Sequence, residues 1–391
     1  MRSHTPFVPG SDAPARSFGM LSSFPPTACG IATFSAALSA GLVANGGTVD
    51  VVRCGTAPEM EDAMVVASLD DGMPADLAAA VDALNQTDVA IIQHEYGIYD
   101  GVDGDAVLSI MEHLVVPSIV VAHTVIGAPS PNQRRVLEEI CDFADMVVVM
   151  TASAQSRLIE GFDVDRTKVC VIPHGAATPL TAPLMAAARP PGHASRLLTW
   201  GLLGPGKGIE WAIDAVASLR DVRPRPTYVI AGATHPKVLA EDGESYRHLL
   251  MRRAENAGAK SFVSFDDAYR DLAALTDLIC SADLVVLPYD SADQVTSGVL
   301  VDAVAAGRPV VSTAFPHAVE LLSTGAGLVV PQRDPVALAE AIRSVVTNPD
   351  LADSMAAEAR RLAPDLSWNA IAGQYDVLAE QLLAALDSVR A

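Results

Sequence analysis

Short runs of β-branched residues alternate along the whole chain with longer runs that are rich in alanine and leucine. This alternation is typical of parallel β-sheets whose strands are connected by helices. Runs such as DLVVLP are apolar at almost every position, so we expect helices to cover both faces of each sheet. The expected strands are residues 18–22, 48–53, 89–93, 118–122, 146–150 and 169–172 in the first half, and 197–200, 228–231, 262–265, 284–287, 309–312 and 328–330 in the second.

A proline-rich stretch interrupts this rhythm near the middle of the chain. Residues 176–195 contain four prolines and little periodicity, which is typical of a linker. A chain of 391 residues is also too long for one ordinary hydrophobic core. We therefore predict an α/β protein with two Rossmann-like domains. The expected parts are a disordered leader at 1–17, domains at 18–180 and 196–366, a linker at 181–195, and a helix at 367–391 that crosses back to the first domain.

The charge and the cysteines argue against several classes of function. The formal net charge is -21, whereas broad contact with nucleic acid or an anionic membrane needs a basic face. No apolar run approaches the roughly 20 residues that span a bilayer, so an integral membrane protein is not expected, while peripheral attachment to a membrane stays open. The five cysteines are scattered without a C-x-x-C pair, which favours reduced thiols in a cytoplasmic protein over disulfides or a zinc site.

The sequence GLLGPGKGIE at 201–210 follows one expected strand and precedes an expected helix. Its glycines and Lys207 have the spacing of a P-loop, but Gly208 stands where a P-loop has the Ser or Thr that binds Mg²⁺. The backbone amides and the positive helix end can still face an anion, and Lys207 adds a full charge. The pattern indicates a phosphate site without the P-loop metal arrangement. The alternative is a Gly/Pro turn with a solvated lysine.

Polar residues also follow the expected strands of the first half. Gly30 lies in a strand-to-helix turn, where the missing side chain permits a ligand to approach the backbone, although such glycines are often only turn residues. His94, Glu95 and His123 follow two strands directly, and His174 follows a third. Because ligands bind beyond the carboxyl ends of parallel strands, we expect these side chains at the rim of a cleft, where histidine can exchange protons near neutral pH.

The second half offers a glycine-containing loop and a helix start. Thr296 or Ser297 is expected to cap the helix that follows, which would direct the first backbone amides toward an anion. Asp302 would lie on the first turns of this helix and could bind the vicinal hydroxyls of a ribose. The alternative makes Asp302 a charge that favours the helix dipole and Gln294 a loop residue. The candidate residues here are Gly232 and His235 in AGATHP, Gln294, Ser297, Gly298, Val299 and Asp302.

Taken in order, these segments resemble those of the GT-B-fold retaining glycosyltransferases of family four, and more closely a mannosyltransferase-like subgroup. The resemblance runs from about Met20 to the segment SWNAIAGQY, nearly the whole chain. It implies two Rossmann-like domains that face each other across a deep cleft, the first for an acceptor and the second for a nucleotide sugar. The segments that carry it are CGIATF, QHEYGIY, AHTV, IPHG, GLLGPGKGIE, AGATHP, LPY, TSGVL and PHAVELL.

The resemblance also implies roles for individual residues. Gly30 would lie in the loop that approaches the donor diphosphate. His123 would contact the transferred sugar, and Lys207 would neutralise the diphosphate leaving group. Gln294 and Asp302 fall on the paired acids of the family, of which the first contacts the donor sugar and the second holds the ribose.

Three departures from the family pattern place more of the diphosphate charge on Lys207 and the helix amides. Leu202 stands where many members have an arginine, Gln294 replaces a glutamate, and Asp302 is one methylene shorter than the usual glutamate. We expect a retaining transferase that moves a hexose, with mannose favoured, from a nucleotide-diphosphate sugar such as GDP-mannose. No metal or other cofactor is expected. The alternatives are a non-catalytic nucleotide-sugar sensor or scaffold subunit and, less favoured, an epimerase or a phosphorylase.

The sequence fixes neither the oligomeric state nor the acceptor, which needs only a hydroxyl group. The acceptor would bind mainly to the first domain. Arg134 and Arg135 either meet an anionic acceptor or begin a solvated helix, and we favour the helix.

Overall fold

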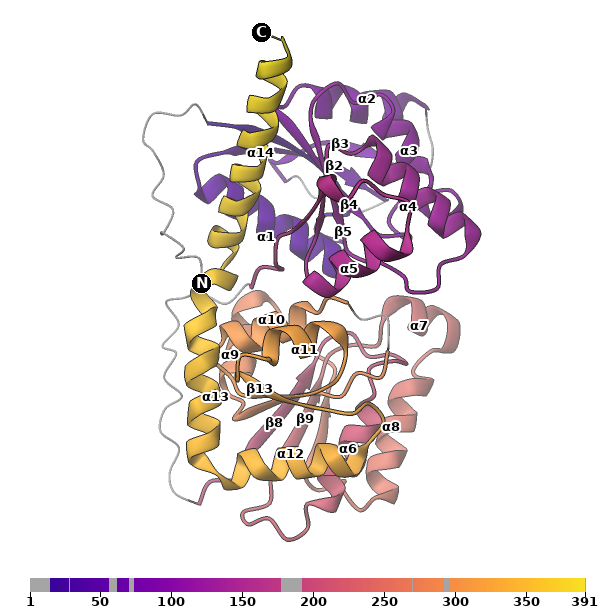
Figure 1. Cartoon of the computed structure of the whole chain (residues 1–391). Helices are drawn as coiled ribbons and strands as arrows, with labels where there is room; N and C mark the ends of the chain where they lie inside the picture. Colours follow the sequence, from indigo (N-terminus) through magenta and orange to yellow (C-terminus); the bar gives the residue numbers. More distant parts are fainter. Residues whose placement is uncertain are drawn as a thin grey trace. The chain divides into compact units, whose positions relative to one another are not determined.

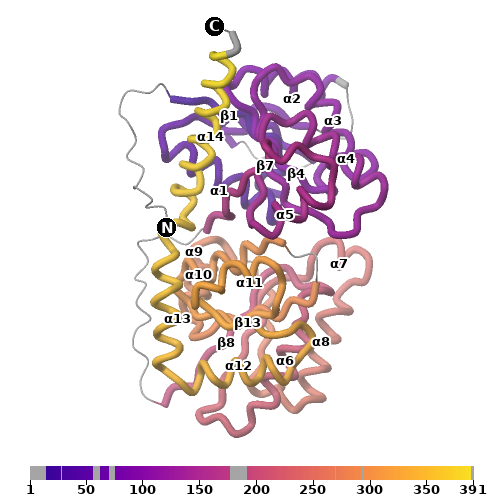
Figure 2. Tube along the Cα trace, in the orientation of Figure 1, coloured from indigo at the N-terminus to yellow at the C-terminus, as the bar shows by residue number. Residues whose placement is uncertain are grey.

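The computed structural model of the chain consists of two compact α/β units, Met1–Gly175 with Trp368–Ala391, and Ala176–Ser367. It describes residues 15–27, 29–55, 62–69, 74–176, 192–268, 270–291 and 295–390. Most of the expected leader, most of the expected linker and the candidate residue Gln294 therefore lie outside the described residues. Figures 1 and 2 show the path of the chain from indigo to yellow.

The first unit contains a seven-stranded parallel sheet in the order β3-β2-β1-β4-β5-β6-β7. The order reverses beside β1, which places a topological switch point between β1 and β4. The elements are β1 (Ser17–Ser22), α1 (Gly30–Ala44), β2 (Thr48–Cys54), β3 (Val65–Leu69), α2 (Pro74–Asn85), β4 (Val89–His94), η1 (Val102–Gly104), α3 (Ala106–Met111), β5 (Ser118–Ala122), α4 (Pro131–Phe143), β6 (Met146–Val149), α5 (Ala152–Gly161), η2 (Arg166–Lys168), β7 (Val169–Val171) and α14 (Trp368–Arg390).

The second unit contains a six-stranded parallel sheet in the order β10-β9-β8-β11-β12-β13. Its switch point lies between β8 and β11. The elements are β8 (Arg196–Trp200), α6 (Ile209–Ser218), β9 (Thr227–Ala231), α7 (Pro236–Asp242), α8 (Ser245–Asn256), β10 (Val263–Asp266), α9 (Leu272–Cys280), β11 (Leu284–Leu287), α10 (Gly298–Ala305), β12 (Val310–Thr313), α11 (Pro316–Leu322), β13 (Gly327–Val330), α12 (Pro335–Thr347), α13 (Pro349–Leu362) and η3 (Ala363–Leu366).

Successive residues of the second sheet enter two different hydrophobic cores. Leu197 packs in the core that contains α6, α8 and α12, whereas its neighbour Leu198 packs in the core that contains α9, α10 and α11. Figure 2 shows α6 and α12 of the first of these layers side by side. Because side chains alternate between the faces of a strand, a sheet covered on both faces needs apolar residues at consecutive positions. The expected two-sided burial is confirmed for the second sheet.

The predicted strands agree with the observed ones to within one residue at each end, but the sequence analysis missed β3. This strand, VVASL, lies at the edge of the first sheet, and each of its residues keeps some exposed surface. An edge strand with one bonded neighbour and a partly exposed face does not require a continuous apolar run. Alanine and serine also interrupt this short run, so its strand signal is weaker than that of the continuous apolar runs in the central strands.

Helix α14 packs against α1 in the first unit (Figure 1). Gly41 of α1 makes a close approach possible, because a Cβ there would lie 2.8 Å from the backbone oxygen of Trp368 and 2.9 Å from Cβ of Ala372. At the start of β1, the Arg16 guanidinium donates hydrogen bonds of 2.6 and 2.8 Å to the two carboxylate oxygens of Asp376. The last helix is thus tied to the first unit by shape and by an ion pair.

We predict that Gly41→Ala lowers the free energy of unfolding of the first unit by about 1–3 kcal/mol, because the added methyl overpacks the α1–α14 contact. Urea unfolding monitored by circular dichroism measures the change. Gly161→Ala at the end of α5 is the matched control, since no atom lies within 4 Å of a Cβ at that position. Equal unfolding midpoints for the two variants would contradict the prediction.

Candidate functional site

The glycine-rich loop between β8 and α6 has the strand-loop-helix context that the sequence predicted. Gly201 and Gly206 have φ angles of 116° and 88°, and Gly208 caps α6 with φ 59°. A Cβ on Gly208 would lie 1.9 Å from the carbonyl oxygen of Pro288, just after β11. The amide of Asp290 also donates a 3.1 Å hydrogen bond to the carbonyl of Gly206. The loop is therefore held against the end of β11 by its backbone.

Lys207 lies at the tip of this loop with its ammonium group over an aromatic ring. Its Nζ is 4.5 Å from the ring centroid of Tyr289, which is buried and stacks on Phe315 at 5.1 Å. Among the described residues, no carboxylate pairs with Nζ. A cation on an aromatic face keeps its full charge for an incoming anion. Tyr289 belongs to the segment LPY, but nothing in that segment predicted its contact with Lys207.

The loop after β9 packs against the same glycine-rich segment. Gly232 has φ 133°, and a Cβ there would lie 2.0 Å from the carbonyl oxygen of Gly201. Leu203 donates to the carbonyl of Ala233 at 2.9 Å, and the amide of His235 donates back to Leu203 at 2.8 Å. The loops that follow β8 and β9 are therefore joined by backbone hydrogen bonds.

Two side chains that the sequence analysis missed support the Gly232 loop. Arg247 of α8 is buried and donates a 2.6 Å hydrogen bond from Nη2 to the carbonyl of Gly232. Its Nε donates to Glu244 at 3.1 Å, and the same carboxylate oxygen accepts from Thr234 at 2.5 Å. These hydrogen bonds lower the pKa of the Glu244 carboxyl, with the bond from Thr234 as the largest cause. Arg247 and Glu244 lie in no motif from which the sequence could have predicted these contacts.

His235 lies beside Lys207 at the start of α7. Its Nδ1 accepts a 3.2 Å hydrogen bond from the amide of Lys237, which requires an unprotonated Nδ1. Burial lowers the pKa of the ring, and the positive charges of Lys237 and Lys207 lower it further. His235 is therefore a neutral ring next to the charge of Lys207.

Helix α10 begins as the sequence predicted, with Ser297 as its N-cap. The Ser297 side chain accepts from the amide of Leu300 at 3.3 Å, and the Ser297 amide donates to Nδ1 of the buried His317 at 3.0 Å. The amides of Gly298 and Val299 come before the first intrahelical bond, which Val301 donates to Ser297. The quoted segment PHAVELL contains His317, but sequence alone did not predict its contact with the cap.

The structure brings these elements together at the carboxyl edge of the second sheet. Val299 Cγ2 lies 3.5 Å from the position that a Cβ on Gly201 would occupy, and Ser291 Cβ lies 3.7 Å from that of Gly206. The edge combines backbone amides, a helix start and one ammonium group. Its nearby carboxylate, Asp290, already accepts hydrogen bonds from Trp211 and Arg333. This arrangement suits an anion such as a diphosphate. Asp302 lies in α10 and is partly buried.

In the first unit, Gly30 is the first residue of α1. Apart from its chain neighbours and the backbone of its own helix, no described atom lies within 4 Å of a Cβ built on it. The helix is capped by the preceding residue, Cys29, whose sulfur accepts from the amide of Ala32 at 3.3 Å. The sequence indicated a reduced thiol at Cys29 and did not predict its role as a helix cap. Gly30 therefore lies in a strand-to-helix turn, as the sequence predicted, while the approach of a ligand to its backbone stays a prediction.

Three histidines gather at the carboxyl edge of the first sheet. Phe34 of α1 meets the His123 ring at 4.7 Å and the His174 ring at 5.1 Å, both edge to face. Trp368 of α14 packs on Phe34 at 4.9 Å and on His174 at 5.5 Å. The ring of His94 lies near enough to influence His123 electrostatically. The strand ends therefore bring together side chains that are far apart in the sequence.

The position of His94 differs from the expected one at the rim of a cleft. Its side chain is 1% exposed, because β4 is buried along its whole length. Neither ring nitrogen has a hydrogen-bond partner among the described residues, and the ring packs on Tyr96 at 5.0 Å. Burial lowers the pKa of His94 to about 4. Glu95 is partly exposed and accepts a 3.0 Å hydrogen bond from the amide of Gly97 within its own turn.

The other two histidines are also held neutral at pH 7. Burial is the largest cause that lowers the pKa of His123 to about 3 and that of His174 to about 4. Both rings keep some exposed surface. Nδ1 of His174 donates to the carbonyl of Gly175 at 2.6 Å. The expected proton exchange near neutral pH is therefore not supported for this cluster.

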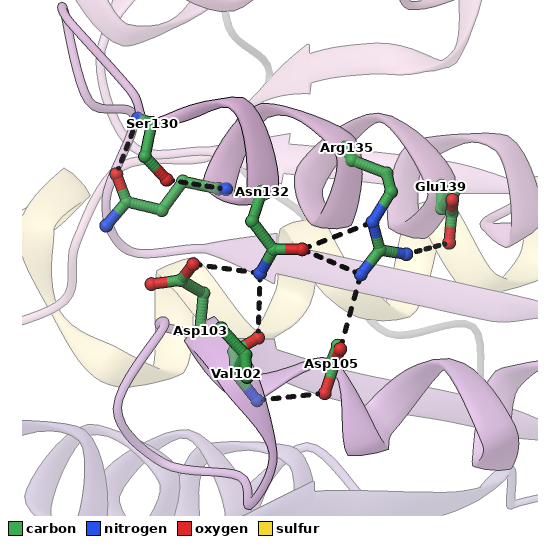
Figure 3. Close-up of polar contacts among 8 residues, drawn as sticks. Val102, Asp103, Asp105, Ser130, Asn132, Arg135 and Glu139 are labelled. Carbon is green, nitrogen blue, oxygen red and sulfur yellow. Dashed lines mark hydrogen bonds and ion pairs between the residues drawn. The ribbon is translucent and has the colours of Figure 1, made fainter.

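Arg134 and Arg135 start a helix with paired charges, which was the favoured interpretation. Figure 3 shows Arg135 donating to Asp105 and Glu139, at 3.2 and 3.0 Å, beside Asn132. Arg134 donates to Glu138 at 3.3 Å, and its guanidinium lies 4.9 Å from the ring of Phe162. Both arginines have carboxylate partners, so they do not form a ready site for an anionic acceptor.

Within the described ranges, no group of three His, Cys, Asp or Glu side chains has a metal-binding arrangement. The same residues contain no helix that is both long and apolar enough to cross a membrane.

Two α/β units, each built on a parallel sheet, form the architecture of the GT-B class of fold. Residues 28–178 match the family described as Glycosyltransferase Family 4, and residues 194–348 match Glycosyl transferases group 1. A D-inositol 3-phosphate glycosyltransferase from Corynebacterium jeikeium is 30% identical over 291 residues, which cover 68% of this chain and 67% of that protein. The chain belongs to the family-four glycosyltransferases, enzymes that act on nucleotide sugars.

Solved structures show the same fold at lower identity. A sucrose-phosphate synthase from Thermosynechococcus elongatus superposes with a TM-score of 0.73 at 20% identity, over 95% of this chain and all of that one. The Anabaena protein HepE in complex with UDP gives a TM-score of 0.72 at 16% identity, over 94% of this chain and 100% of that one. These likenesses establish the GT-B fold, and they leave the mannosyltransferase-like subgroup as a proposal.

We predict that acid destabilises the first unit partly through His94. The unfolded chain binds a proton at this residue below pH about 6.5, whereas the folded ring resists protonation down to about pH 4. Stability from this residue is therefore complete above pH 6.5 and falls as the pH drops toward 4. Between pH 7 and 4, the free energy of unfolding of His94→Phe should therefore fall by about 2–3 kcal/mol less than that of the wild type.

Urea unfolding at a series of pH values measures this slope. The same substitution at the exposed His113 is the control for a general effect of the added ring. If His94→Phe and wild type lose stability equally between pH 7 and 4, the buried ring does not cause the acid sensitivity.

Proposed function

We propose that this glycosyltransferase transfers a hexosyl group from a nucleotide-diphosphate sugar to a hydroxyl acceptor with retention of anomeric configuration. The resemblance to the mannosyltransferase-like subgroup makes GDP-mannose the first donor to test. UDP-glucose is the main competitor, because HepE, which has the same fold, binds UDP. The proposal assigns the second unit to the donor and the first to the acceptor.

The unneutralised charge of Lys207 carries the proposal. Its ammonium lies on the face of Tyr289 without a carboxylate partner among the described residues. The glycine-rich backbone of 201–208 and the start of α10 lie at the same sheet edge. In this proposal the diphosphate of the donor binds to the amides and accepts the charge of Lys207.

The chemistry follows from where charge develops. Cleavage of the anomeric bond leaves an oxocarbenium-like sugar and places negative charge on the departing diphosphate. Groups that are already oriented toward that charge lower the barrier without reorganising. We propose that Lys207 and the amides of the loop and of α10 supply this stabilisation, without a resident metal or cofactor. Gly208 supports that assignment, since it lacks the hydroxyl with which a P-loop binds Mg²⁺.

The roles of the remaining candidates rest on the resemblance. His123 would contact the transferred sugar, and Asp302 would hold the ribose of the nucleotide. Gln294 would hydrogen-bond hydroxyls of the sugar, which an amide can do although it cannot act as a carboxylate.

A donor screen tests this function. Thermal shift and slow hydrolysis of GDP-mannose, UDP-glucose, UDP-GlcNAc and ADP-glucose should identify one donor that stabilises the wild type and is turned over. Lys207→Ala should reduce turnover of that donor by about 100- to 1000-fold, because it removes the cation that meets the leaving group. Lys260→Ala, at an exposed lysine paired with Glu255, is the matched control.

Two results of the screen would redirect the proposal. If Lys207→Ala turns over the donor as fast as Lys260→Ala, Lys207 does not stabilise the leaving group. Binding of a donor without turnover, even with a panel of hydroxyl acceptors, would overturn the proposed reaction in favour of a sensor or scaffold.

We also predict that the product keeps the anomeric configuration of the donor and that turnover survives excess EDTA. Front-face attack on an ion-pair-like state gives retention without a covalent glycosyl-enzyme. NMR of the first product formed distinguishes the anomers directly. An inverted product would contradict the retaining mechanism, and loss of turnover in EDTA would contradict the metal-free one.

A further inference from the structure

The side chain of Gln93 in β4 contacts that of His123, which follows the neighbouring strand β5. Gln93 is the next-to-last residue of β4 and is fully buried. In the parallel register it pairs with Val121 of β5, and His94 pairs with Ala122, so that His123 is the first residue beyond the pair. The His123 amide continues the ladder by donating a 3.0 Å hydrogen bond to the carbonyl of His94. The proposed function does not use Gln93.

The side-chain amide of Gln93 contacts Met20 on one side and His123 on the other. Its Nε2 lies 3.2 Å from Sδ of Met20 in β1, and its Oε1 lies 2.7 Å from Nε2 of His123. A thioether sulfur can accept a hydrogen bond but cannot donate one, so the amide NH₂ must face Met20. The carbonyl oxygen therefore faces His123, and Nε2 of His123 must carry the hydrogen.

Further contacts hold the backbone of Gln93 and the ring of His123 in place. The backbone carbonyl of Gln93 accepts a 2.6 Å hydrogen bond from the hydroxyl of Tyr99. On the other side, Phe34 meets the His123 ring at an interplanar angle of 81°. The ring of His123 is thus oriented by one hydrogen bond and one aromatic contact. Its remaining nitrogen, Nδ1, is left with a lone pair.

We propose that Gln93 is a positioning residue that fixes His123 as the neutral Nε2–H tautomer, so that Nδ1 accepts a hydrogen bond from a hydroxyl of the transferred sugar. The inference rests on the proposed function for its substrate, but the tautomer itself does not. His123 then orients the sugar as an acceptor of a hydrogen bond and does not act as an acid at neutral pH.

The groups around the ring support a neutral state. The titratable side chains that face His123 are His94 at the end of β4 and His174 after β7, and positive charge on either would oppose protonation of His123. Phe34 and Trp368, from α1 and α14, add only aromatic surface. In the part of the chain that the structure describes, no carboxylate pairs with the ring. A glutamine at 93 therefore sets the tautomer without adding a charge.

Histidine-selective ¹⁵N NMR of the full chain tests the tautomer without any substrate. Comparison with His123→Asn assigns the ring signals. The wild type should show a neutral ring at pH 7 with the proton on Nε2. Gln93→Met, which keeps the volume and replaces the amide oxygen with the much weaker acceptor of a thioether, should move the ring toward a mixture of the two tautomers. Gln93→Glu should raise the pKa of His123 by about 1–3 units, since a carboxylate stabilises the imidazolium.

Donor hydrolysis supplies the second readout. Gln93→Met should lower kcat on the order of 10- to 100-fold with a smaller change in KM, because a misplaced ring costs mainly in the transition state. Gln93→Glu should add a new acid limb to the pH profile at the raised pKa of His123. Gln155→Met is the matched control, since Gln155 of α5 donates to the carbonyl of Val169 and does not touch His123.

The outcomes separate this inference from the proposed function. A wild-type ring with the proton on Nδ1, or charged at pH 7, overturns the role of Gln93. So does a Gln93→Met variant that keeps the wild-type tautomer, or one whose kcat equals that of Gln155→Met. If the wild type hydrolyses no donor, the proposed function fails, whereas the NMR result still decides whether Gln93 sets the tautomer.

Discussion

The geometry at the carboxyl edge of the second sheet depends on two places where the backbone leaves no room for a side chain. Gly208 lies against the carbonyl of Pro288, and Gly232 lies against that of Gly201. These contacts hold the loops after β8, β9 and β11 against one another at this edge of the sheet. A methyl group at either glycine would force the loops apart, and Lys207 would lose its fixed position over Tyr289. Backbone proximity thus places the cation.

A fixed cation needs a surrounding that does not neutralise it. The carboxylate of Asp290, close to the loop, is occupied by Trp211 and Arg333, and an aromatic face supports the ammonium of Lys207. The N-cap Ser297 is itself held by His317, which sets the direction of the first amides of α10. The departure at Leu202 from the family arginine is compatible with this arrangement, because positive potential comes from several amides as well as from one lysine.

The first unit uses neutral groups at the matching edge of its own sheet. Burial keeps the rings of His94, His123 and His174 unprotonated at pH 7, and Phe34 packs against two of them. Trp368, the first residue of α14, closes the same cluster. A ring with a set tautomer and no charge suits recognition of sugar hydroxyls, which offer hydrogen bonds and no net charge.

Much of the fold could be predicted because its signal is local. Apolar runs at consecutive positions identified the central strands of both sheets, and the short run VVASL of the edge strand β3, which alanine and serine interrupt, was missed. Gly-rich sequence after β8 and a serine before α10 also predicted their turn and cap, since both depend on nearby residues.

The sequence by itself determined the two parallel α/β halves, the loop with Lys207 and the start of α10, because periodicity, turn residues and caps act over a few positions. Only the tertiary structure decided which distant residues meet. Arg247 under Gly232, Tyr289 under Lys207 and Gln93 beside His123 have no pattern of their own. It also decided that His94 is buried and not at a rim, since exposure depends on what packs over a residue and not on its place at the end of a strand.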